Sequence, residues 1–168
     1  MRQIFRDSGA GILACRGDAL QPIQIKRRRL PHWTIKDATY FVTFRLVAKQ
    51  LDDNEIVLVI NHIVAGDKKF YWLIAAIVMP DHAHLILRPN ADFSLSRILH
   101  GMKGMSARLL NKKRQTKGTV WQDESLDRII RSEEELYEKL KYMYENPVRK
   151  GLVDDGSKYV SWYCNLIP

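Results

Sequence analysis

The sequence predicts an α+β domain of the split βαβ, or ferredoxin-like, type, in which an antiparallel sheet carries helices on one face. Two observations lead to this fold class. Strand and helix patterns follow one another as strand, helix, strand, strand, helix, strand, which is the order of the split βαβ unit. The chain has 168 residues, of which 46% are hydrophobic, so it is long and apolar enough for one core. We expect a flexible arm, residues 1–25, before a single domain, residues 26–168.

The first strand and the first helix are predicted from residue type and spacing. Residues 39–46 are rich in β-branched and aromatic side chains with partial alternation, as in a strand. Asp52 or Asp53 can cap a following helix, which ends at Gly66. The apolar residues of this helix recur at helical spacing and predict its buried face: Ile56, Val59, Ile60, Ile63 and Val64.

A hairpin and a second helix follow. Residues 70–79 and 82–87 are apolar runs joined by a turn at Pro80 and Asp81, which predicts two paired strands. Residues 94–114 show the three- and four-residue spacing of an amphipathic helix. Its predicted core residues are Leu95, Leu99, Met102, Met105 and Leu109.

The last strand and the last helix lie close together. Residues 126–131 are short and β-branched, and they predict the fourth strand. Ser132 and Glu135 form the pattern of a capping box that opens a helix. We expect this helix to end near Asn146, because Pro147 disfavours helical geometry in the residue before it.

The charge of the chain favours a polyanionic partner. The 27 Lys and Arg residues exceed the 19 Asp and Glu residues, which gives a net charge of +8. Residues 93–122 contain no acidic residue. We predict that basic residues contact nucleic-acid phosphates: Lys103, Arg108, Lys112 and Arg131, with Arg27, Arg28 and Arg29 of the N-terminal basic run. The alternative is that these residues form a solvated basic surface.

Several classes of protein are excluded or disfavoured. No apolar run approaches the ~18 residues of a membrane helix, and the apolar N-terminal stretch is too short for a secretory signal. We therefore expect a cytoplasmic protein. Cys15 and Cys164 lie at opposite ends of the chain, which excludes a disulfide framework and a four-cysteine zinc site.

Two histidines are candidates for metal binding. His82 and His84 lie two positions apart on a predicted strand, so both imidazoles point to the same face and can converge on one ion. The alternative is a pair of half-exposed sheet histidines that bond to neighbours or water. Asp81 places a carboxylate at the mouth of the hairpin, although we expect it to be a plain turn residue.

The last helix contains a second set of candidates. Tyr142 and Asn146 lie four residues apart, so they share a line beside the core stripe of Leu136, Leu140 and Met143. Tyr137 and Tyr144 lie on the opposite flank. Periodicity alone predicts that these tyrosines pack with their hydroxyls in water. Three aromatic residues near the C-terminus can stack on bases or, as we expect, pack the tail onto the domain: Tyr159, Trp162 and Tyr163.

The segment around the histidine pair resembles the signature of the HUH single-strand endonucleases. Residues 78–87, Val-Met-Pro-Asp-His-Ala-His-Leu-Ile-Leu, are most similar to the REP-associated tyrosine transposases of bacteria, a branch of the single-tyrosine transposase family. Further strings agree with that family in order and spacing over about residues 26–163. They are Leu30-Pro31-His32-Trp33 with residues 39–45, Met102-Lys103-Gly104, Val120-Trp121-Gln122 with residues 127–131, and residues 142–147 with Gly151-Leu152-Val153.

The resemblance implies a chemistry as well as the same fold. It implies a divalent cation, Mg²⁺ or Mn²⁺, held by His82 and His84 and completed by Asn146. It implies that Tyr142 is the nucleophile that attacks a DNA phosphate, with Tyr144 as the second choice. The attack would form a covalent 5′-phosphotyrosine link and free a 3′-hydroxyl, so no ATP is needed. The implied substrate is single-stranded DNA that carries a palindromic hairpin.

The sequence is also compatible with other functions and assemblies. A domesticated protein could keep the fold and bind hairpins without cutting them. A replication or mobilisation initiator of the same superfamily is disfavoured by the short chain, which has no helicase domain. A basic RNA-binding domain would have no use for the histidines. The protein could act as a monomer or as a homodimer that swaps its tyrosine helix, with the swap point in residues 118–122.

Overall fold

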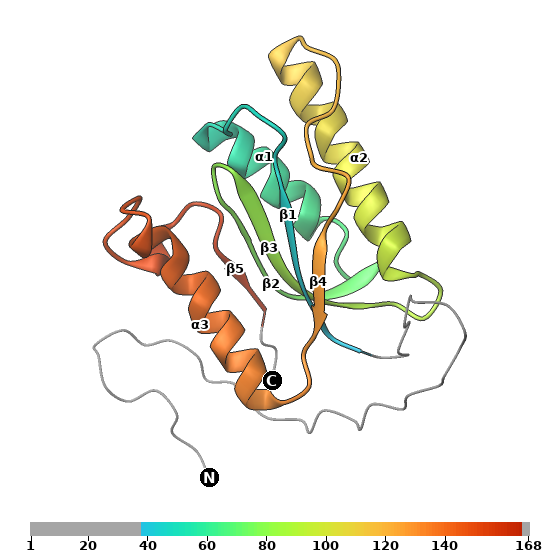
Figure 1. Cartoon of the computed structure of the whole chain (residues 1–168), viewed down its shortest axis with the longest axis vertical. Coiled ribbons are helices and arrows are strands. Elements are labelled where there is room, and N and C mark those ends of the chain that lie inside the picture. Colours follow the sequence, from blue (N-terminus) through green and yellow to red (C-terminus); the bar gives the residue numbers. More distant parts are fainter. Residues whose placement is uncertain (1–37, 166–168) are drawn as a thin grey trace.

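The computed structural model describes residues 38–165, in which the predicted strands and helices follow one another in the predicted order and are joined by a 3₁₀ helix and a fifth strand that were not predicted. The elements are β1 (Tyr40–Arg45), α1 (Asp53–Val64), β2 (Tyr71–Val78), β3 (His82–Pro89), α2 (Leu95–Arg114), β4 (Leu126–Ile129), α3 (Glu133–Arg149), the short 3₁₀ helix η1 (Gly156–Lys158) and β5 (Tyr163–Cys164). The strands form one antiparallel sheet in the order β4-β1-β3-β2-β5 (Figure 1). Because β3 lies between β1 and β2, the predicted split βαβ fold is confirmed.

The sheet is covered on both faces. α1 and α2 pack on one face, over the larger core, and α3 packs on the other (Figure 1). The prediction of helices on one face therefore describes α1 and α2, whereas α3 lies on the opposite face. The reason is that β2 and β3 are apolar on both sides, so each side needs a cover. The smaller core, under α3, consists of Ala75, Ile77, Met79, Ile86, Ile130, Leu140, Met143 and Tyr159.

The helices begin at the predicted capping residues, with one difference. At α1, Asp52 and Glu55 form a complete capping box, because each side chain accepts from the backbone N–H of the other. At α3, the hydroxyl of Ser132 accepts from the backbone N–H of Glu135 at 3.2 Å. The Glu135 carboxylate does not complete the box, since it accepts instead from the backbone N–H of Arg131 at 2.9 Å. The prediction of Ser132 as the N-cap is confirmed, whereas the prediction of a capping box with Glu135 is wrong.

The prediction that α3 ends near Asn146 is also wrong. The helix continues through Pro147 to Arg149, because its last turn is closed by the bond from the Lys150 N–H to the Asn146 carbonyl at 3.0 Å. Gly151, with a φ of +67°, then takes the left-handed conformation that ends many helices. Proline removes one donor within a helix, and so near the end of α3 it costs one hydrogen bond rather than the helix.

The C-terminal segment packs back onto the domain, as expected. The hydroxyl of Tyr159 donates to the Val78 carbonyl at 3.1 Å, and the Ser161 hydroxyl donates to the same carbonyl at 2.8 Å. β5 then pairs with β2 and covers that edge of the sheet. The ring of Trp162 lies edge-on against Tyr144 of α3, with ring centroids 5.6 Å apart.

Two predictions lie outside the described residues. They are the arm at residues 1–25 and the basic run Arg27, Arg28 and Arg29. Within residues 38–165, no helix is both long enough and apolar enough to cross a bilayer.

Candidate active site

The histidine pair lies on β3, on the face of the sheet that α3 covers. The antiparallel register places His84 opposite Thr43 of β1 and His82 opposite Arg45. Both histidines are only 4% exposed, and their ring centroids are 4.5 Å apart. The two imidazoles therefore converge, as the spacing predicts, but they are buried rather than half-exposed.

Each imidazole is held through its Nδ1 atom. The Nδ1–H of His82 donates to the Asp81 carboxylate at 2.7 Å, since an ionised carboxylate only accepts. A hydrogen bond of 2.7 Å joins His84 Nδ1 to the hydroxyl of Thr43. The expectation that Asp81 is only a turn residue is therefore wrong: its side chain orients the ring of His82. With both Nδ1 atoms occupied, Nε2 is the remaining nitrogen of each ring, and in His82 it lies 3.4 Å from the Asn146 amide of α3.

The Nε2 atoms of the two imidazoles fit a metal ligand set. His84 Nε2 is buried without a hydrogen-bond partner among the described residues, and such an atom costs free energy unless a ligand satisfies it. Holding the Nδ1 atom of a histidine with a carboxylate or a hydroxyl is the usual way to present Nε2 to a metal. Within residues 38–165, no three or more His, Cys, Asp or Glu side chains are grouped so that they could hold a metal ion. Any third protein ligand in this region would therefore be another kind of side chain.

The protonation of the pair also fits metal binding. Burial lowers the pKa of His82, although the Asp81 carboxylate opposes this effect. Burial, reinforced by His82 and Arg45, lowers the pKa of His84 to about 3. Both rings are thus neutral at physiological pH, and neutral imidazole is the form that binds a metal ion.

Helix α3 brings Tyr142 and Asn146 to the same place. Leu140 and Met143 are fully buried against the sheet and fix the rotation of the helix about its axis. The amide of Asn146 is 6% exposed, and its Nδ2 lies 3.4 Å from His82 Nε2. Flipping the Asn146 amide by 180° would place its oxygen, instead of Nδ2, next to His82 Nε2.

Tyr142 is the exposed member of the site. Its side chain is 40% exposed, and its ring lies edge-on to His84 with centroids 5.3 Å apart. A substrate can therefore reach the phenol while the histidines stay buried. Tyr144, in contrast, lies on the other flank of α3, where its hydroxyl donates to Asp155 at 2.6 Å.

Three cations near the histidines were missed in the sequence. The charges of Arg45 and Lys150 act on His82, and those of Arg45 and Lys139 act on His84, in each case lowering a pKa that burial has already lowered. Arg45 could have been found, because it lies two positions after Thr43 on the same face of β1. Lys139 could have been found from its spacing of three to Tyr142.

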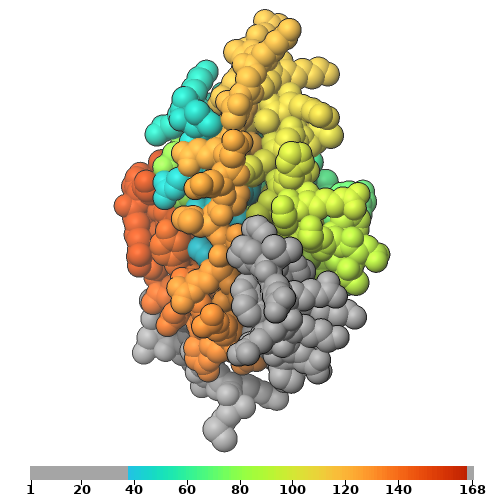
Figure 2. Space-filling view, turned by 45° about the vertical axis from the view of Figure 1, so that its right-hand side comes forward, coloured from blue at the N-terminus to red at the C-terminus, as the bar shows by residue number. Residues whose placement is uncertain are grey.

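The predicted basic residues lie elsewhere, and two of them line a groove. A groove of about 990 Å³ separates α2 from β4 and the loop that leads into β4. Lys103 and Arg131 are among its lining residues, whereas Arg108 and Lys112 are exposed on α2. In the space-filling view of Figure 2, the chain from the end of α2 through β4 runs along the surface next to α2.

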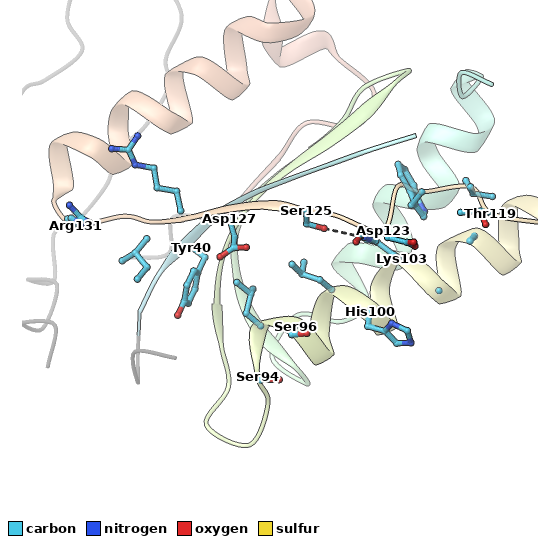
Figure 3. Close-up of a pocket in the computed structure, with 18 residues that line it drawn as sticks. Tyr40, Ser94, Ser96, His100, Lys103, Thr119, Asp123, Ser125, Asp127 and Arg131 are labelled. Atoms are coloured by element: carbon cyan, nitrogen blue, oxygen red, sulfur yellow. Dashed lines mark hydrogen bonds between the residues drawn. The ribbon is translucent and has the colours of Figure 1, made fainter. Parts of the chain in front are cut away.

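The groove and the histidine pair lie on opposite faces of the sheet. Asp127 and Tyr40 point toward α2 in the groove (Figure 3). Arg128, the next residue of β4, forms an ion pair with Glu135 of α3 at 3.3 Å. The ammonium of Lys103 donates to the Asp123 carbonyl at 2.6 Å and to the Ser125 hydroxyl at 3.2 Å (Figure 3). Strand β4 is therefore the boundary between the two sites.

Comparisons with known proteins agree on one family. Residues 45–128 match the model of the family described as transposase IS200 like. A Haemophilus influenzae protein that carries the name REP-associated tyrosine transposase is 31% identical over 91 residues. That alignment covers 48% of this chain and 52% of the relative, so the chain matches about half of the relative's length.

A solved structure extends the likeness of the fold. A REP-associated tyrosine transposase bound to a REP hairpin superposes with a TM-score of 0.65 and 20% sequence identity. The match covers 84% of this chain and 94% of that one. At this level of identity the comparison shows that the two proteins share a fold.

Proposed function

The chain belongs to the family of IS200-like transposases, and from that premise we propose that it cuts and rejoins single-stranded DNA at hairpin-forming repeats. The observation that carries the proposal is the convergence of Tyr142 with the buried pair His82 and His84. The H. influenzae relative and the hairpin-bound structure support a hairpin of the REP type as substrate.

Tyr142 is the proposed nucleophile. Its phenolic oxygen attacks the phosphorus, the bond from phosphorus to the 3′ oxygen breaks, and a 5′-phosphotyrosine link forms. The phenol loses its proton as the new bond forms, and the leaving 3′ oxygen takes one up to become a hydroxyl. In the reverse step, a 3′-hydroxyl attacks the link and releases Tyr142, so the strand is rejoined without ATP.

The residues around the tyrosine prepare this step. His82, His84 and Asn146 would hold a divalent cation, Mg²⁺ or Mn²⁺, and Asp81 and Thr43 orient the two rings. When bound, such a cation supplies Lewis-acid polarisation of the phosphate oxygens and stabilises the transition-state charge. The fold buries the imidazoles, which lowers their pKa values and favours the neutral form, while leaving the phenol accessible.

The basic residues around α2 are the proposed contacts to the rest of the DNA. Arg131 and Lys103 line the groove, and Arg108 and Lys112 lie on the exposed side of α2. A single strand that follows these residues would reach the nucleophile by crossing the edge of the sheet at β4. Arg27, Arg28 and Arg29 are kept as further contacts on the grounds of charge alone.

The test is a cleavage assay on single-stranded hairpin oligonucleotides taken from repeats that flank the gene. With Mn²⁺ we expect an adduct of protein and DNA that survives denaturation. EDTA and Tyr142→Phe should both abolish the adduct, whereas Tyr144→Phe should retain it. Binding of several hairpins without an adduct, on both strands, would contradict the proposal and identify a hairpin-binding protein that does not cut.

A further inference from the structure

A lysine of α3 lies on the same side of the helix as the proposed nucleophile. Lys139 precedes Tyr142 by three residues and Asn146 by seven, so the three share one face of α3. The Nζ atom of Lys139 lies 5.3 Å from the centroid of the Phe41 ring, on the neighbouring strand β1. This cation therefore points back over the sheet rather than out along the helix surface.

The Phe41 ring connects this lysine to the rest of the site. The ring stacks on His84 at a centroid distance of 5.3 Å and an interplanar angle of 23°. It also meets the ring of Tyr142 edge-on at 6.3 Å. One phenyl ring thus packs against the proposed nucleophile, a proposed metal ligand and the lysine.

Among the described residues, no carboxylate neutralises the charge of Lys139. Within residues 38–165, no Asp or Glu lies within ion-pair distance of Lys139. Other cations of α3 are paired: Lys141 lies 3.8 Å from Glu145, and Arg149 lies 2.6 Å from the same carboxylate. An aromatic face attracts an ammonium without cancelling its charge. Within residues 38–165, Lys139 is therefore a cation of α3 that contacts an aromatic ring of the site instead of a carboxylate.

We propose that Lys139 is a catalytic residue that binds a non-bridging oxygen of the phosphate attacked by Tyr142. The inference rests on the proposed function, because it needs a phosphodiester at this site. As the tyrosine adds to phosphorus, the phosphate gains negative charge, and a fixed cation stabilises that charge more than it stabilises the ground state. Phe41 serves as a neutral platform that holds the lysine without competing for its charge.

The test compares Lys139→Met with Lys139→Arg and with Lys141→Met. The measured quantity is the rate of adduct formation in a single turnover, with saturating hairpin oligonucleotide and Mn²⁺. Lys139→Met should slow the reaction about 100-fold, while the Kd for the hairpin changes by less than about threefold. Lys139→Arg should restore most of the rate. Lys141→Met, which removes a lysine paired with Glu145, should react like the unchanged protein.

A second substrate separates a charge effect from a structural one. Replacing a non-bridging oxygen of the scissile phosphate by a methyl group gives a neutral methylphosphonate, whose transition state carries one negative charge fewer, so a cation has less charge to stabilise. The defect of Lys139→Met should then shrink to less than about threefold. An equal defect on both substrates, or no defect on either, overturns the role of Lys139. Absence of any adduct with the unchanged protein overturns the proposed function instead.

Discussion

At the scale of single residues, the site depends on how each polar side chain is held. His82 and His84 lie on the same face of β3, yet the ring of His82 is oriented by a carboxylate and the ring of His84 by a hydroxyl. The positions of the histidines follow from the sequence, since alternate residues of a strand share a face. The role of Thr43 does not, because it depends on the register between β1 and β3, which is set by many weak contacts along both strands.

A buried ion pair outside the site gives a residue-scale prediction. Glu55 of α1 accepts from the guanidinium of Arg114 of α2 through two bonds of 2.7 Å. The bonds to Arg114 lower the pKa of Glu55, so the ion pair contributes stability above the ordinary pKa and loses it as the pH falls through the folded pKa. Glu55→Gln should lower the free energy of unfolding by about 2 kcal/mol at neutral pH.

Urea unfolding at two pH values measures this effect. Below the folded pKa of Glu55 the carboxyl is neutral in the unchanged protein as well, so the difference between the two proteins should largely disappear. The exposed Glu124 offers a control, because Glu124→Gln should have little effect at either pH. A loss of equal size in acid and at neutral pH would show that the ion pair is not the source of the stability.

At the scale of elements, α3 shows what local patterns can and cannot predict. Its start at Ser132 and its buried stripe follow from capping preference and helical periodicity. The end of α3 does not follow from these local patterns. Pro147 predicts an earlier end, whereas the hydrogen bonds of the Lys150 and Leu152 N–H groups to carbonyls of the last turn extend the helix. The face of the sheet that α3 covers is likewise a tertiary choice, made by the apolar outer sides of β2 and β3.

The contact between α3 and η1 gives an element-scale prediction. A Cβ atom on Gly156 would overlap the backbone carbonyl of Tyr144, so η1 can lie against α3 only with glycine there. Gly156→Ala should destabilise the protein by about 2 kcal/mol, as overpacking does. On α2, a Cβ on Gly101 would meet nothing within 4 Å. Gly101→Ala should therefore stabilise the protein by up to about 1 kcal/mol through helix propensity.

Chemical denaturation of the two alanine variants distinguishes these effects. Opposite signs are expected, although the substitution is the same. If Gly156→Ala were neutral, η1 would not be held tightly against α3, and the position of the tyrosine helix would have to be set by the sheet contacts of Leu140 and Met143 alone.

At the scale of the whole molecule, the site is assembled within one chain. The rings of Tyr142 and His84 that lie 5.3 Å apart belong to the same polypeptide, although β3 and α3 are separated by α2 and β4. The element order predicts the sheet, and the sequence motifs predict which residues meet. The groove between α2 and β4 was not predicted, because its shape depends on how far the loop before β4 stands off the helix.

Assembly within one chain predicts the result of mixing two inactive variants. His82→Ala and Tyr142→Phe, when co-expressed, should form no adduct with hairpin DNA, because each chain lacks one part of its own site. A dimer that exchanges α3 would behave differently, since one chain would supply Tyr142 to the intact histidines of the other. The adduct assay measures the outcome, and an adduct from the mixture would show that the site is shared between two chains.

Strand β4 is an edge strand of the sheet, and within the described residues it pairs only with β1. An unpaired margin can recruit a strand from another molecule and start aggregation. Here the margin is four residues long and carries the opposite charges of Asp127 and Arg128 at its centre. A foreign strand would gain few backbone bonds and would have to desolvate both charges. The short strand that forms one side of the groove therefore also disfavours edge-to-edge pairing with the sheet of another molecule.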